Sequence, residues 1–156
     1  MTEAPALARS CGPCVACCDG SLRITVDGES VHPGKPCRHC TGSGCAIHGR
    51  HPRDPCQLFV CGWLEPTSPL PEWMRPDKAG VVLLPAKLAW HGLRVDVAVP
   101  TGRGPTQKAL RWLQDFSRRQ RRPLLYQIGE DWYAFGPPEF QHEIKARLAR
   151  GESLWR

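Results

Sequence analysis

The sequence predicts an α+β protein in two parts: a loop-rich cysteine metal-binding module (residues 1–65), then a small antiparallel sheet with helices on one face, in the order ββαββα (residues 66–156). Three observations predict it. All nine cysteines lie between Cys11 and Cys61. The 15 glycines and 16 prolines favour turns and short elements. In residues 66–156, segments whose apolar residues have the spacing of a strand alternate with segments whose apolar residues have the spacing of a helix.

The first part has one strand-like run, residues 22–26, in which apolar and polar side chains alternate before an Asp27-Gly28 turn. Residues 31–54 have almost no apolar periodicity and are rich in Gly, Pro, His and Arg. Such a segment cannot build a core from its side chains alone, and bound metal supplies folding energy in small cysteine-rich modules. The proline-rich residues 66–71 favour an extended connector, which places the boundary between the two domains.

The second part has sequence patterns that are typical of strands and helices. Residues 81–84 read as a buried strand, and residues 93–99 alternate as a second strand after a His91-Gly92 turn. A helix opens at Pro105 and stops before Pro123. Its apolar side chains recur at helical spacing. They are Ala109, Leu110, Leu113 and Phe116, with Trp112 beside them.

The chain then continues with a second hairpin and a last helix. Residues 124–128 and 132–135 flank the Gly129-Glu130-Asp131 turn. The helix follows Pro138, carries Phe140, Ile144 and Leu148 on one face, and ends at Gly151.

Charge is divided as unevenly as the cysteines. Residues 1–65 hold six basic and six acidic side chains, so the second part carries the whole formal charge of +6. Its sharpest feature is a basic run. The run contains Arg118, Arg119, Arg121 and Arg122. It fits a solvated helix end, where cations oppose the macrodipole, or a patch for an anion, a nucleic acid or an acidic protein partner.

The lack of a membrane-spanning stretch and of a secretory signal favours a cytoplasmic protein. No stretch approaches the ~20 apolar residues that cross a bilayer, so no membrane association is expected. The first ten residues, MTEAPALARS, lack the apolar core of a secretory signal. Structural disulfides are rare in the cytosol, and nine is an odd number to pair. The cysteines therefore read as metal ligands.

The candidate ligands come as a CxxCxxCC run, a CxxC and three more widely spaced residues. They are Cys11, Cys14, Cys17, Cys18, Cys37, Cys40, Cys45, Cys56 and Cys61. Two residues between cysteines let a turn aim both sulfurs at one ion. Neighbouring side chains such as those of Cys17 and Cys18 rarely converge on one ion, so each should serve a different ion or bridge a cluster.

These residues resemble the YkgJ-type cysteine-cluster proteins, a family described as zinc- or iron-chelating domains. The resemblance covers about residues 11–64. It is carried by the CxxCxxCC run, Pro36-Cys37-Arg-His-Cys40, Gly44-Cys45-Ala-Ile-His48, Pro52 and Cys56-Gln-Leu-Phe59-Val-Cys61-Gly-Trp63-Leu64. This chain has His48, His51 and Gln57 where the family usually has Tyr, Arg and Arg. The resemblance implies metal chelation and leaves the reaction open.

The identity of the metal stays open at this level. Thiolates suit zinc, in two four-thiolate sites or one bridged cluster, and they equally suit iron or a [4Fe–4S] cluster. A metal-free thiol system is the third reading. His39, His48 and His51 could each replace a sulfur or lie outside the ligand shell.

The sequence is consistent with three candidate functions. The first is a metal-binding protein with a structural or chelating role. The second is an iron–sulfur enzyme or electron carrier, and the third a nucleic-acid-binding adaptor shaped by zinc. No phosphate loop, zincin helix or nucleophile elbow occurs, so no catalytic constellation is evident beyond the cysteines.

Overall fold

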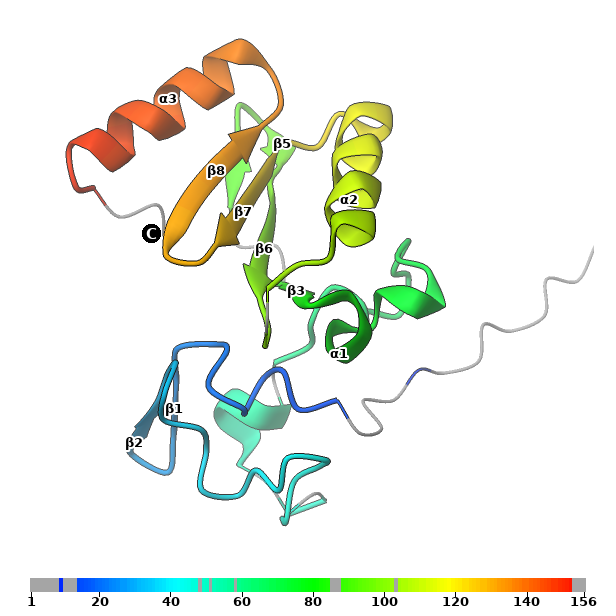
Figure 1. Cartoon of the computed structure of the whole chain (residues 1–156), viewed down its shortest axis with the longest axis vertical. Coiled ribbons are helices and arrows are strands. Elements are labelled where there is room, and N and C mark those ends of the chain that lie inside the picture. Colours follow the sequence, from blue (N-terminus) through cyan, green and yellow to red (C-terminus); the bar gives the residue numbers. More distant parts are fainter. Residues whose placement is uncertain are drawn as a thin grey trace, which may run out of the picture.

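The computed structural model describes residues 9, 14–47, 49–50, 52–57, 59–84, 88–102 and 104–152. The cysteine module lies at one end of the molecule, and the larger sheet with its two long helices lies at the other (Figure 1). Short strands and helices alternate along the chain, which confirms the α+β class. Among the described residues, no helix has the length and apolar character needed to cross a membrane.

The cysteine module is built on one short hairpin. Strands β1 (Ile24–Val26) and β2 (Glu29–Val31) pair antiparallel, and Asp27 and Gly28 form the turn with φ of 50° and 79°. Positive φ at both central residues is what a tight two-residue turn needs, so the Asp-Gly prediction is confirmed. The strand begins at Ile24, later than expected. An irregular helical turn, η1 (Arg53–Gln57), packs against β1.

The connection to the sheet runs through η2 (Glu72–Met74) and α1 (Pro76–Ala79). Trp63, Leu70 and Met74 are buried together with the apolar side chains of the sheet. Just before this segment, the Gly62 amide donates to the Leu83 carbonyl at 2.8 Å. The chain that leaves the last cysteine is therefore bonded directly to a strand of the sheet.

The central sheet has four strands in the order β3 (Val81–Leu83), β6 (Asp96–Pro100), β7 (Leu124–Ile128) and β8 (Asp131–Phe135). The outer pairs are antiparallel, but β6 and β7 run parallel. The expectation of a wholly antiparallel sheet is therefore wrong for this pair. A helix lies between β6 and β7 in the chain, and such a crossover returns the chain in the same direction.

The predicted strand over residues 93–99 divides in two. Strands β4 (Ala89–Trp90) and β5 (Leu93–Arg94) form a separate small hairpin around the predicted His91-Gly92 turn. The Val95 amide still bonds to Leu88, whereas the Asp96 amide bonds to Pro123 beside the central sheet. The chain changes sheets between these two residues.

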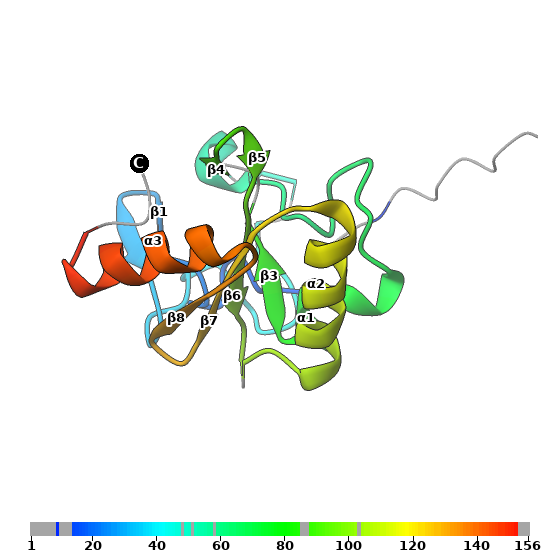
Figure 2. The same ribbon diagram turned by 90° about the horizontal axis from the view of Figure 1, so that it is seen from above.

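The long helices α2 (Gln107–Gln120) and α3 (Pro138–Ala149) lie on opposite sides of the sheet (Figure 2). The expectation of helices on one face is therefore wrong. Both faces of the sheet are apolar, because its strands contain consecutive apolar residues and neighbouring side chains point to opposite sides. Leu124 packs on the α2 side with Leu113, and Leu125 packs on the α3 side with Phe140.

The ends of the helices also refine the predictions. Helix α2 begins two residues after Pro105, because the Thr106 hydroxyl accepts the Ala109 amide at 3.1 Å and caps the first turn. In α3, Phe140 and Ile144 are buried as expected. Leu148 is 37% exposed, so the buried face is shorter than predicted.

Candidate metal centre

Eight of the nine candidate cysteines lie in the described part of the chain, and no disulfide joins any of the eight. Cys11, together with His48 and His51, lies outside the described residues. The eight thiols come from the CxxCxxCC run, the CxxC and the segment around η1, and the fold brings them into two neighbouring groups.

The first group surrounds the inner face of the β1–β2 hairpin. Cys37 is buried with Val26 and Val31, and Cys18, Cys40 and Cys56 pack against this apolar centre. The backbone sets the arrangement, because the Cys37 amide donates to Cys18 at 2.8 Å and the Cys40 amide donates to Cys37 at 2.9 Å. The two cysteine motifs, nineteen or more residues apart in sequence, are thus adjacent. Cys45 joins them through a β-bridge to Cys40.

The second group lies between the hairpin and the central sheet. Cys17 and Cys61 pack against Leu22, Val82 and Val99. Burial raises the pKa of the Cys61 thiol, and the charges of Cys14 and Cys17 act in the same direction. Burial also raises the pKa of Cys14, and the charge of Cys17 acts in the same direction, whereas backbone hydrogen bonds from Ala16 and Asp77 act to lower it. Cys14, Cys17 and Cys61 are therefore electrostatic neighbours.

Cys18 connects the two groups. Its thiol donates a hydrogen bond to Cys17, which is the largest cause of the lowered pKa of Cys17, about 7. The same bond, burial and the contact with Cys40 raise the pKa of Cys18. Adjacent cysteines thus face different neighbours, Cys17 the sheet side and Cys18 the hairpin side.

The arrangement fits a metal in its chemistry but not in its present geometry. Thiols in a half-buried, partly apolar setting suit zinc or iron–sulfur. Within the described ranges, however, no three side chains of His, Cys, Asp or Glu are placed so that they could hold one ion. The structure brings the predicted ligands together without closing a coordination shell.

Of the three candidate histidine ligands, His39 lies in the described residues and has another partner. His39 Nε2 lies 3.2 Å from a carboxylate oxygen of Asp27, at the turn of the hairpin. Arg38 also reaches Asp27, at 3.5 Å, and Glu29, at 3.6 Å. His39 therefore belongs to a polar cluster over the β1–β2 turn rather than to the thiols.

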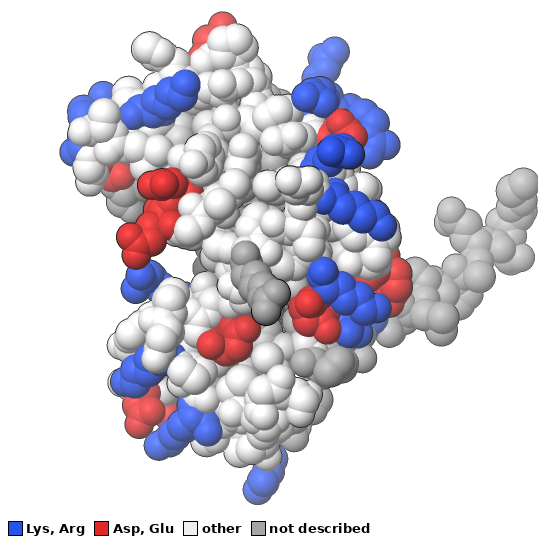
Figure 3. Space-filling view, in the orientation of Figure 1, with Lys and Arg blue, Asp and Glu red and all other residues white. Residues whose placement is uncertain are grey.

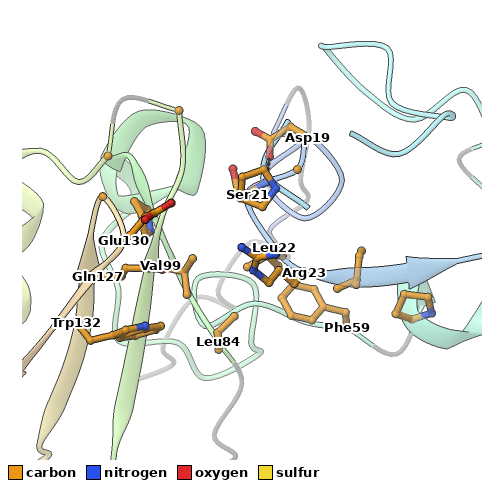
Figure 4. A pocket seen from close by; sticks show the side chains of 18 of the residues that line it. Asp19, Ser21, Leu22, Arg23, Phe59, Leu84, Val99, Gln127, Glu130 and Trp132 are labelled. Carbon is orange, nitrogen blue, oxygen red and sulfur yellow. Dashed lines mark hydrogen bonds between the residues drawn. The ribbon is translucent and has the colours of Figure 1, made fainter. Parts of the chain in front are cut away.

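A cleft between the module and the sheet was not predicted from the sequence. It has a volume of about 1140 Å³, and Leu22 and Phe59 face Val99 and Trp132 across it (Figure 4). Its lining also includes Arg23 and three carboxylates. The carboxylates are Asp19, Asp54 and Glu130. No sequence motif marks these positions, because the cleft exists only where the two parts of the fold meet.

The four arginines of the basic run have unequal surroundings. Arg119 and Arg121 are exposed at the end of α2. Arg122 is half-buried and donates to the buried carboxylate of Asp96. Burial raises the pKa of Asp96, although Arg122 and Arg94 act to lower it. Arg122 therefore has a structural partner, and the exposed part of the run is smaller than its sequence suggests.

Comparison with known proteins returned no matching family model, no matching curated protein and no matching solved structure.

Proposed function

We propose that this chain is a cytoplasmic metal-binding protein that holds zinc through its cysteine cluster, in a structural or chelating role. The observation that carries the proposal is the convergence of sequence-distant cysteines around the β1–β2 hairpin and beside it. A reducing compartment keeps these thiols free for metal. The resemblance to YkgJ-type proteins in cysteine spacing agrees with chelation.

The two groups suggest how the ligands divide. Cys18, Cys37, Cys40 and Cys56, with Cys45 next to them, would hold one ion. A second ion would be held by four further cysteines. These are Cys14, Cys17 and Cys61 from the second group, and Cys11 on the strength of its CxxC spacing alone. Four thiolates satisfy tetrahedral zinc, which would supply a cross-link between segments that share little apolar surface.

The alternative is an iron–sulfur centre, for which the same thiols provide suitable ligands. Protein purified without oxygen and analysed for metal, sulfide and visible absorption separates the two. Colourless protein with about two zinc ions per chain supports the proposal, as expected for eight thiolates in two tetrahedral sites. Brown protein with iron and labile sulfide favours the alternative. Purified protein that takes up neither metal when reduced contradicts both.

A further inference from the structure

The β7–β8 hairpin presents aromatic side chains on the side of the sheet that faces α2. Tyr126 and Tyr133 are directly opposite each other in the antiparallel register, and their rings stack with centroids 5.4 Å apart and an angle of 18°. Tyr133 is 44% exposed, and Ile128 on the same face is 43% exposed. Because Tyr126 covers one face of the Tyr133 ring, the exposed surface is the other face and the ring edge.

A cation from α2 adjoins this pair. The Arg118 guanidinium lies over the ring of Phe135, 5.0 Å from its centroid. Phe135 follows Tyr133 by two residues in the same strand, so the two rings share a face of the sheet. We call Tyr126, Tyr133 and Phe135 the aromatic platform. Arg111 precedes Arg118 by seven residues, or two helical turns, and so lies on the same side of α2.

Positive charge dominates the helix beside the platform. From residue 107 to residue 122 there are six basic side chains and a single acidic one, Asp115. Among the described residues, Arg111, Arg119 and Arg121 make no ion pair, whereas Arg118 pairs with Asp115 at 3.1 Å. Basic side chains gather over α2 on the face of the molecule shown in Figure 3, next to an uncharged area. Glu130 and Asp131 lie at the turn of the hairpin and bound the platform there.

From this arrangement we infer that the aromatic platform and the α2 cations bind single-stranded nucleic acid. Bases of any sequence stack on exposed aromatic rings, while flanking cations neutralise the phosphates. A duplex keeps its base faces covered, so it could use the cations but not Tyr133. An acidic peptide would likewise depend on charge alone. The proposal does not depend on the metal site, because the platform and the α2 cations include no cysteine. Cys17 packs on the opposite side of the sheet, and Cys61 contacts the apolar side chains of both sides.

The test uses the full chain and a fluorescent oligothymidylate of about 12 nucleotides, within the range that one such surface covers. Binding is followed by anisotropy at several salt concentrations. Tyr133→Leu keeps an apolar contact with Tyr126 but removes the stacking face, and should weaken binding about tenfold. Tyr133→Phe should bind like the wild type. Arg111→Gln should reduce the slope of log affinity against log salt by about 0.7, the share of one phosphate contact on a single strand.

Arg23→Gln is the matched control, because it removes the same charge from the cysteine module and should leave the affinity nearly unchanged. Metal content and circular dichroism of every variant show whether it is folded. The inference is overturned if folded Tyr133→Leu binds as tightly as the wild type. It is equally overturned if a duplex of the same length, or polyglutamate, binds as well as the single strand.

Discussion

The position of Cys18 between the two thiol groups leads to an unequal effect of two neighbouring substitutions. Cys17 packs toward the sheet with Cys61, whereas Cys18 contacts both Cys17 and Cys40. Cys17→Ser should therefore disturb mainly the second site. Cys18→Ser should disturb both sites, because it removes a thiolate ligand of the first site at a position that contacts Cys17 of the second.

The expected size of the effect follows from the number of thiols. Eight thiolates in two tetrahedral sites hold about two zinc ions. Cys17→Ser should then retain about one ion per chain against a competing chelator. Cys18→Ser should retain clearly fewer, and the double variant no more than Cys18→Ser, because coupled sites do not add.

Metal analysis after dialysis against a graded chelator measures these numbers, and circular dichroism establishes that the central sheet is folded in each variant. Equal losses of one ion in the two single variants, with a loss of two in the double variant, would show uncoupled sites and refute the role given to Cys18. Full occupancy in the double variant would show that neither thiolate is a required ligand.

Three further predictions concern stability. Chelator treatment should abolish amide protection in the cysteine module and leave the central sheet protected, since only the sheet has a large apolar core; unchanged exchange in the module would contradict a metal scaffold. Asp96→Ala should lower the free energy of unfolding in urea by about 2–3 kcal/mol, because it leaves the half-buried Arg122 without its carboxylate partner. The exposed Asp115→Ala should cost less than about 0.5 kcal/mol, and equal costs for the two variants would refute this. Gly80→Ala should destabilise the protein more than Gly92→Ala, although both glycines have a similar positive φ. A Cβ at Gly80 would lie 2.1 Å from a backbone oxygen, whereas a Cβ at Gly92 would meet no atom within 4 Å. Equal midpoints of urea unfolding for the two variants would contradict the clash.

Local spacing predicted the elements of the sheet well but not their arrangement. The strand predicted over residues 124–128 and the helical spacing of Phe140 and Ile144 are confirmed, because each depends on the residues of one element alone. Strand direction is different. Whether β6 runs parallel to β7 depends on which strands become neighbours after α2, and residue spacing carries no information on that choice.

The candidate site was predictable in its residue types and less so in its grouping. Cysteine spacing indicated which residues gather, but the contact of Cys18 with both Cys17 and Cys40 depends on the backbone bond between Cys37 and Cys18. The association of His39 with Asp27 arises from the hairpin turn. The stacking of aromatic residues across β7 and β8 depends on register, which no single run of residues displays.

The bond between Gly62 and Leu83 bears on solubility. Strand β3 is an outer strand of the central sheet, and outer strands with free backbone groups recruit strands from other molecules. Here the chain next to Cys61 occupies that position, and it approaches so closely that a Cβ at Gly62 would lie 2.7 Å from the Leu83 side chain. The cysteine module therefore covers the exposed edge of β3, and release of Cys61 from its neighbours would leave this edge strand free to pair with another molecule.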